Sequence, residues 1–118
     1  MDKTSSTEIM QQSVAILKDK LASNVEVIDI REQTIIADYF VIASGRTDAH
    51  VRALCDYVDE GIKEKLDIDP LHREGLENSR WIVLDYGGVI VHLFRNDERE
   101  FYSIEKLWAE APRVDIGE

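Results

Sequence analysis

Histidine, cysteine and aspartate are the residues of this sequence that could support catalysis or bind a metal. The three histidines, His50, His72 and His92, are scattered, and no pair has a spacing such as HxxxH that would place two imidazoles on one helix face. The single cysteine, Cys55, falls on the apolar stripe of a predicted helix, where a small buried hydrophobe is expected rather than a nucleophile. The sequence therefore predicts neither a metal site nor a catalytic thiol.

Two further segments have residue types found in nucleotide-handling sites. Residues 44–50, SGRTDAH, could place main-chain N–H groups around a phosphate at a helix N-terminus, but their one glycine is not a GxGxxG or GxxxxGK[ST] loop. Asp67 and Asp69 could hold Mg²⁺ as paired carboxylates, but they lie directly before Pro70, where exposed turn residues are expected. The sequence gives no positive sign of an enzyme, and we expect no cofactor.

Residues 81–94, WIVLDYGGVIVHLF, are predicted to form a β-hairpin whose two faces differ. Gly87 and Gly88 suit a tight turn because both can adopt positive φ without steric cost. With this turn, Tyr86 falls on a nearly all-aliphatic face, and the opposite face carries a carboxylate, an imidazole and two large rings. The cross-strand pairs of that second face are Trp81 with Phe94, Val83 with His92, and Asp85 with Ile90.

Helices and strands that would position these residues alternate along the chain. Apolar residues at spacings of three and four predict helices that begin near residues 5–7, at Thr47 or Asp48, and at Asp97. Strands are predicted over residues 25–30, 38–45 and 71–75, and the continuous apolar run of the second indicates burial on both faces. The sequence thus predicts an α/β fold, a mixed β-sheet with three helices packed on it.

Length and composition restrict the class of protein. A chain of 118 residues is one domain, which we expect to span residues 1–112, with 113–118 as a flexible tail after Pro112. No apolar run approaches the roughly 18 residues of a membrane span, and the N-terminus has no hydrophobic signal core. One cysteine suits a reducing compartment, so we expect a cytoplasmic protein.

The net charge of −10 bears on the kind of partner. Nucleic-acid binding relies on Lys and Arg, and a chain with 24 acidic and 14 basic residues would be repelled by phosphates overall. The same charge would speed encounter with a basic protein. We therefore expect little direct nucleic-acid contact and favour a basic protein partner, although an acidic surface can also serve solubility alone.

A docking surface is the functional hypothesis that these observations favour. Tyr102 and Glu105 lie one turn apart beside Trp108 on the last predicted helix, and rings mixed with a few charges are typical of interface hot spots. Three alternatives stay open: a helix could cover the aromatic hairpin face, the face could close on a second copy in a homodimer, or the chain could retain nucleotidyltransferase activity.

Four ordered segments of the chain resemble the ribosomal silencing factor family, also called the Iojap-like family. They are ADYFVIASG (37–45), EG (74–75), WIVLDYGGVIVHLF (81–94) and REFYSIEKLWAEAP (99–112), and the resemblance covers almost the whole chain. Two positions depart from the usual pattern. Gly88 stands where an acidic or polar residue is common, which weakens the case that the turn contacts a partner. Phe101 replaces a common tyrosine, which suggests a buried ring.

The resemblance implies a nucleotidyltransferase-like fold without catalytic residues, in agreement with the poor fit of Asp67 and Asp69 to that role. It implies binding to the large ribosomal subunit through protein fourteen of that subunit, a basic protein at the intersubunit face. There the domain would obstruct joining of the small subunit and lower translation when nutrients are scarce, while organellar relatives assist large-subunit assembly. Matching the motifs residue by residue predicts the partner-binding residues Trp81, Asp85, Tyr86, His92, Phe94, Tyr102, Glu105 and Trp108.

Overall fold

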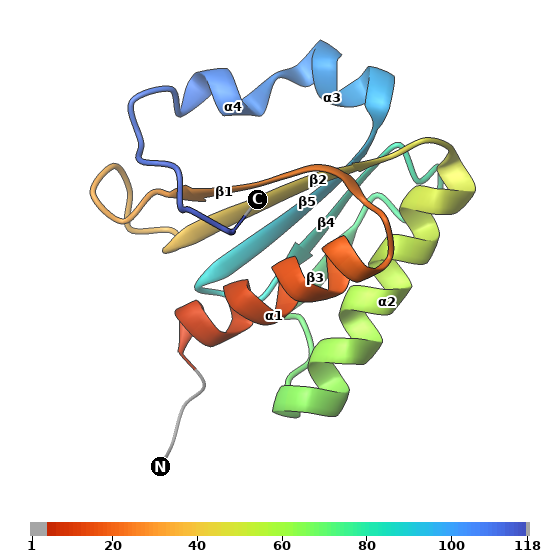
Figure 1. The fold of residues 1–118 in the computed structure, drawn as a ribbon, viewed down its shortest axis with the longest axis horizontal. Coiled ribbons are helices and arrows are strands. Elements are labelled where there is room, and N and C mark those ends of the chain that lie inside the picture. The colour runs from red at the N-terminus through yellow and green to blue at the C-terminus, as the bar shows by residue number, and fades with distance from the viewer. Residues whose placement is uncertain (1–4, 118) are drawn as a thin grey trace.

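The structure, a computed structural model, describes residues 5–117, in which one β-sheet lies between two groups of helices (Figure 1). The predicted mixed α/β fold is confirmed. Residues 1–4, where the predicted domain begins, and residue 118, where the predicted tail ends, lie outside the described residues. The elements in chain order are α1 (Ser6–Asp19), β1 (Ser23–Asp29), β2 (Tyr39–Gly45), α2 (Asp48–Leu66), β3 (His72–Glu74), β4 (Trp81–Asp85), β5 (Val89–Arg95), α3 (Asn96–Tyr102) and α4 (Ile104–Leu107).

The sheet has the strand order β1-β2-β5-β4-β3, and only the β2–β5 pair is parallel. β2 is the central strand expected from its apolar run, and all seven of its residues are buried. The hairpin register is the predicted one, since Trp81 lies opposite Phe94 and Asp85 opposite Ile90. At the turn, the N–H of Tyr86 donates to the carbonyl of Val89 at 2.9 Å, and Gly87 has φ of 90°.

The helices α1 and α2 cover one face of the sheet, seen below it in Figure 1. α1 begins at a capping box formed by Ser5 and Glu8, and the Thr47 hydroxyl caps α2 by accepting from the N–H of His50 at 3.0 Å. Both caps lie where the sequence predicts them. Cys55 is buried in this layer, as predicted, and burial raises its pKa to about 11.

The predicted third helix is broken into α3 and α4. Ser103 adopts a left-handed conformation with φ of 48°, which ends α3 and redirects the chain. Asp97 does not cap α3, because the helix begins at Asn96 after Arg95. The break also rotates the predicted apolar stripe: Phe101 and Leu107 are 78% and 77% exposed. The inference that the Phe101 ring is buried is therefore wrong.

Residues 108–114 return along the outer edge of β1. The N–H of Asp29 donates to the carbonyl of Pro112, and the N–H of Val114 donates to the carbonyl of Val27, both at 2.9 Å. Arg113 forms a bridge with Ile28 between these two bonds. Two residues of the predicted flexible tail, Arg113 and Val114, thus pair with β1 and cover the backbone of an edge strand, while the flexibility of residues 113–118 stays a prediction.

Candidate functional site

The face of the sheet opposite α1 and α2 carries a cluster of aromatic side chains, here called the ring cluster. Its members come from three strands and from the segment that holds α3 and α4: Phe40, Trp81, His92, Phe94, Tyr102 and Trp108. The Trp81 ring lies 4.9 Å from Phe94 and 4.5 Å from Tyr102, centroid to centroid. Phe40 lies edge-on to His92 at 4.8 Å and to Trp108 at 5.4 Å. These separations are typical of favourable aromatic pairs.

The hairpin register places these rings on a shared face. Trp81 and Phe94 are directly opposite one another, and Val83 is opposite His92. In the parallel pair, Ile42 is the partner of His92, so alternation places Phe40 on the same side two residues earlier. The sheet therefore brings together Phe40 and His92, which are 52 positions apart in the chain.

His92 lies at the centre of the ring cluster and is only 8% exposed. Its Nδ1 accepts a hydrogen bond from the indole Nε1–H of Trp81 at 3.2 Å. The other ring nitrogen, Nε2, is buried and has no hydrogen-bond partner. Burial lowers the pKa of His92 to about 4, against a smaller opposing effect of the Glu105 carboxylate. The imidazole is therefore neutral at pH 7.

Glu105 forms an internal ion pair with a buried arginine. Arg99 is 8% exposed, and its Nε donates to a carboxylate oxygen of Glu105 at 2.8 Å. Arg99 also donates to the Ser44 hydroxyl at 2.9 Å and to the carbonyl of Asn24. Burial by itself would raise the pKa of Glu105, but the hydrogen bond and charge of Arg99 lower it below its ordinary value. Glu105 thus ties α4 to α3 and the sheet.

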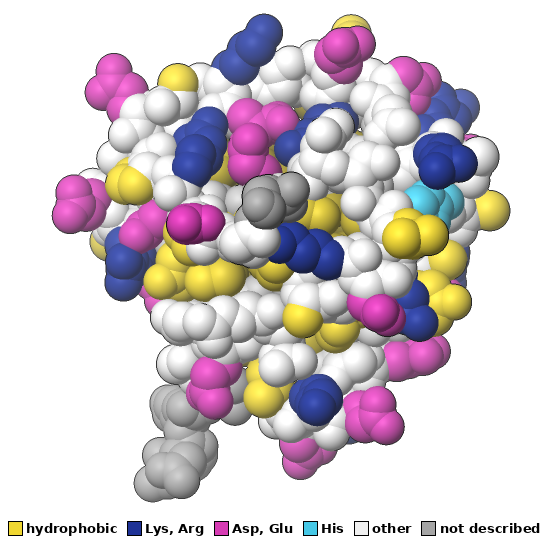
Figure 2. Space-filling view, viewed as in Figure 1, with side chains coloured by type: hydrophobic (Ala, Val, Ile, Leu, Met, Phe, Trp, Pro, Cys, Tyr) yellow, Lys and Arg dark blue, Asp and Glu magenta, His cyan; other side chains and the backbone are white. Residues whose placement is uncertain are grey.

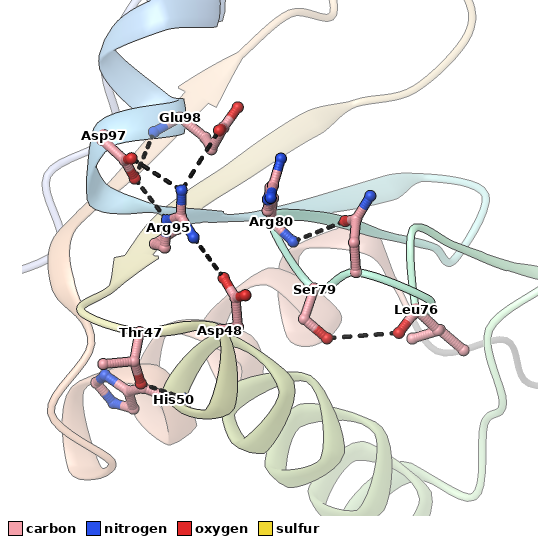
Figure 3. A network of polar contacts seen from close by, with 10 residues as sticks. Thr47, Asp48, His50, Leu76, Ser79, Arg80, Arg95, Asp97 and Glu98 are labelled. Atoms are coloured by element: carbon pink, nitrogen blue, oxygen red, sulfur yellow. Dashed lines mark hydrogen bonds and ion pairs between the residues drawn. The ribbon is translucent and has the colours of Figure 1, made fainter.

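A second arginine fixes the start of α3, as Figure 3 shows. Arg95, the last residue of β5, donates to Asp97 at 2.7 and 2.9 Å and to Asp48 of α2 at 2.9 Å. These bonds lower the pKa of the Asp97 carboxyl below its ordinary value. Arg95 therefore links the start of α3 to α2, in the opposite helical layer.

The predicted partner-binding residues divide into accessible and inaccessible groups. Trp81, Asp85 and Trp108 are half-buried, and Tyr102 is 44% exposed. Phe94 is completely buried and Tyr86 nearly so. Burial in the free protein argues against these two as contact residues, and their assignment stays a prediction that only a complex can test. His92 and Glu105 are held by internal contacts.

Tyr86 lies on the other face of the sheet, in the core formed with α1 and α2. Its buried hydroxyl has no hydrogen-bond partner, and burial raises the pKa of the phenol. The predicted hairpin register had already placed this residue with the aliphatic side chains. Tyr86 is therefore a core residue.

The accessible residues lie together on the sheet surface that α3 and α4 leave uncovered, here called the open face. Its members are Trp81, Val83, Asp85 and Ile90 from the strands, with Phe101 and Tyr102 from α3. The rings of Phe101 and Tyr102 lie 5.1 Å apart, and Tyr102 continues the series to Trp81. One carboxylate oxygen of Asp85 accepts from the N–H of Gly87 at 2.8 Å. The open face is an apolar and aromatic surface with one carboxylate.

Sequence reasoning missed three contributors. Phe101 is expected to be buried because it replaces a common tyrosine and falls on the apolar stripe of a helix predicted to continue through Ser103. Ile90 was recognised as the partner of Asp85 but not as a surface residue. Arg99 gives no signal in the sequence, since an arginine on a short helix is ordinarily solvated.

One cleft among the described residues is lined mainly by polar side chains. A cleft of about 900 Å³ lies between α3, α4 and the ends of β1 and β2. Its lining residues are Ser23, Asn24, Ser44, Asn96, Asp97, Arg99, Glu100, Ser103, Glu105 and Lys106. Within residues 5–117, histidine, cysteine and carboxylate side chains nowhere gather in threes around a position for a metal ion. The same residues include no helix with the length and apolar character to cross a membrane.

Comparisons with known proteins agree with the arrangement of the fold. The "Ribosomal silencing factor RsfS" of Halalkalibacterium halodurans is 36% identical over 112 residues, which cover 95% of both chains. The protein of the same name from Bacillus subtilis is 35% identical and covers 92% of this chain and 91% of its own. The mouse protein "Mitochondrial assembly of ribosomal large subunit protein 1" is 34% identical over 80% of this chain and 42% of its own length.

Solved structures share the fold over most of its length. A Chromobacterium violaceum protein superposes with a TM-score of 0.85 at 28% identity, covering 90% of this chain and 88% of its own. A Bacillus halodurans protein superposes with a TM-score of 0.81 at 33% identity, covering 93% and 99%. The family described as "Ribosomal silencing factor during starvation" matches residues 3–118. The chain belongs to the ribosomal silencing factor family.

Proposed function

We propose that this protein binds the large ribosomal subunit through its protein fourteen and blocks joining of the small subunit, so that translation falls when nutrients are limiting. The observation that carries the proposal is the open face. Trp81, Ile90 and Tyr102 form an accessible apolar surface beside the Asp85 carboxylate. Desolvated rings with a charged rim are the usual composition of a specific protein interface.

The charge of the molecule supports a basic partner. The chain carries a net charge of −10, and on the face shown in Figure 2 basic side chains are separated by acidic and uncharged ones. Such a surface attracts a protein rich in Lys and Arg and repels exposed phosphates. Asp85 is the acidic residue of the open face itself, so it is the first candidate to pair with a basic side chain.

The size of the molecule supports a steric mode of action. Its principal extents are 40, 33 and 27 Å. A body of this size on the intersubunit face of the large subunit would keep the two subunits apart at that place, and no chemical step is required. The bacterial relatives are named ribosomal silencing factors, which supports a role in lowering ribosome activity.

The Asp85→Asn variant tests the proposal with little structural disturbance. The asparagine oxygen can still accept from the N–H of Gly87, so the turn keeps its hydrogen bond while the charge is lost. We expect binding to isolated large subunits to weaken by about 5- to 30-fold at low salt, and its dependence on salt to become shallower. Co-sedimentation at several salt concentrations measures both effects.

Glu64→Gln is the matched control, because Glu64 is an exposed carboxylate on α2, across the sheet from the open face. This variant should bind as the wild-type protein does. Equal losses in the two variants would mean that net charge alone governs binding, and an unchanged Asp85→Asn variant would remove Asp85 from the site. Glu105 is unsuitable for this test because its substitution would break the ion pair with Arg99.

Assistance in large-subunit assembly is a second candidate function. It is favoured by the mouse relative, which is named for mitochondrial assembly of the ribosomal large subunit. The two functions differ in the particle that they require. Tighter binding to immature large subunits than to mature ones would favour assembly, whereas a dose-dependent loss of subunit joining with mature particles favours silencing.

A further inference from the structure

The His92 side chain is buried in the ring cluster with one nitrogen bonded and one nitrogen without a partner. Nδ1 accepts from the indole of Trp81 at 3.2 Å, so the proton of the neutral ring resides on Nε2. That N–H is buried and unpaired. A buried donor without an acceptor costs free energy, and an apolar side chain of similar size would avoid the cost. The position therefore carries a polar group whose one hydrogen bond is to Trp81.

The packing of His92 in the core does not require an imidazole, whereas its hydrogen bond to Trp81 does. The ring of His92 already packs against Phe40 at 4.8 Å and against Phe94 at 6.3 Å, contacts that an apolar ring could equally make. What an apolar ring could not supply is an acceptor beneath the indole. Trp81 is half-buried on the open face, so its ring has both a fixed inner edge and an accessible outer part.

The second tryptophan of the chain provides an internal comparison. Trp108 is also half-buried and also contacts Phe40, at 5.4 Å, but the structure gives its indole nitrogen no hydrogen-bond acceptor. The hydrogen bonds that the structure gives Trp108 are those of its backbone: its N–H donates to the carbonyl of Glu105 at 3.3 Å, and its carbonyl accepts from Arg113 and from the N–H of Ala111. Of the two indoles, that of Trp81, on the open face, is held by a hydrogen bond to a side chain.

We infer that His92 is a positioning residue: it does not touch the partner, but it accepts the indole N–H of Trp81 and so fixes the ring that the open face presents. This inference rests on the proposed function, because it assigns Trp81 to the surface that meets the large subunit. Fixing a side chain before binding reduces the conformational entropy lost on association, so a freed indole should bind more weakly even when every contact atom is still present.

Three variants separate positioning from packing. His92→Leu removes the acceptor and keeps an apolar side chain. His92→Asn restores an acceptor, because the amide oxygen of asparagine can take the place of Nδ1. Phe40→Leu loosens the same cluster, since Phe40 contacts both His92 and Trp108, but it leaves the acceptor of Trp81 in place.

The readouts are the indole N–H signals in nitrogen-edited NMR spectra and the affinity for isolated large subunits. The chain has two tryptophans, and a Trp81→Phe variant assigns its two indole signals. In His92→Leu we expect the Trp81 signal to shift and to exchange faster with water while the Trp108 signal stays, and affinity to fall about 10-fold. His92→Asn should recover both properties, and Phe40→Leu should keep the Trp81 signal despite a lower melting temperature.

The inference is overturned if His92→Leu leaves the Trp81 indole signal in place, or if it displaces that signal without loss of affinity. It is also overturned if His92→Asn and His92→Leu behave alike. A wild-type protein that does not bind large subunits would refute the proposed function instead. In that case the indole signals would still decide whether His92 fixes Trp81.

Discussion

Tyr102 is the residue at which the docking hypothesis can be tested with the least damage to the fold. Its ring is 44% exposed, packs on Trp81 at 4.5 Å and continues to Phe101 at 5.1 Å. Trp81 and Trp108 are more enclosed, and Phe94 has no exposed surface, so their removal would perturb the ring cluster itself. Loss of the Tyr102 ring should act mainly on binding.

We predict that Tyr102→Ala lowers affinity for large subunits by about 10- to 30-fold and changes the free energy of unfolding by only about 1 kcal/mol. Tyr57→Ala is the matched control, because Tyr57 is 43% exposed but lies on α2, across the sheet from the open face. Sedimentation binding and urea unfolding of both variants measure the two effects. If Tyr57→Ala bound more weakly than Tyr102→Ala, the contact surface would lie on the side of α2, and the open face would not be the docking site.

His92 makes the stability of the fold depend on pH. Its pKa is lowered by burial to about 4, below the ordinary value of 6.5, so the unfolded chain takes up a proton at a higher pH than the folded chain does. The stabilisation is therefore complete above about pH 6.5 and is lost as pH falls toward 4. Carboxyls with lowered pKa, such as Glu105 and Asp97, add to the loss only at lower pH.

We expect the free energy of unfolding to fall by about 2 kcal/mol between pH 7 and pH 5 through His92, at roughly 1.4 kcal/mol for each unit of pKa difference. Urea unfolding at the two pH values measures the change. The His92→Asn variant lacks the titrating group and should lose most of this dependence. The same slope in wild type and variant would show that other groups cause it.

At the scale of elements, most of the architecture can be predicted, because turn residues and helix caps in the sequence mark where the strands and helices of the fold begin and end. The Gly87-Gly88 turn fixes the hairpin register, and the Ser5 and Thr47 caps fix where α1 and α2 begin. The break after α3 could not be predicted, since apolar spacing continues through Ser103 and a serine gives no local signal for the positive φ that it adopts. The predicted site omits Phe101 for the same reason, because a continuous helix would place that ring on its buried stripe.

The site was predictable to the extent that strand alternation governs it. Alternation separated Tyr86 from Trp81 and Asp85, and the structure places them on opposite faces as expected. Whether a ring on the correct face is covered depends on the path of the segment 96–112, which long-range contacts of Arg95 and Arg99 determine. The sequence gives no sign of those contacts, so it leaves open whether a helix covers Phe94, and it does not predict the internal ion pair of Glu105.

The C-terminal segment is held against the edge strand β1 and against α4. Arg113 donates to the carbonyls of Glu105, Trp108 and Ala111, and Val114 adds a backbone hydrogen bond to β1. We expect deletion of residues 113–118 to lower the free energy of unfolding by about 1–3 kcal/mol and to promote association through the uncovered edge of β1. Thermal unfolding and light scattering measure both consequences.

Arg113→Ala is the control for this deletion, because it removes the side-chain bonds and keeps the backbone on β1. It should lose part of the stability without association. A truncated protein as stable and as monodisperse as the full chain would show that residues 113–118 behave as the flexible tail that the sequence suggests.

At the scale of the whole molecule, the proposal depends on shape and charge rather than chemistry. The acidic chain, with a charge of −10 and extents of 40, 33 and 27 Å, would meet a basic ribosomal protein with one face and occupy the intersubunit space with the rest of its volume. The open face supplies the contact, the arginine-linked segment 96–107 holds Tyr102 over Trp81, and α1 and α2 give the sheet its rigid support.

The most direct test mixes purified large and small subunits with increasing amounts of this protein and follows the joined ribosome by sedimentation. The account predicts that the protein pellets with the large subunit, that joined ribosomes decline with dose, and that Tyr102→Ala needs about 10-fold more protein for the same decline. A protein that binds the large subunit while joining proceeds undiminished would contradict the steric account.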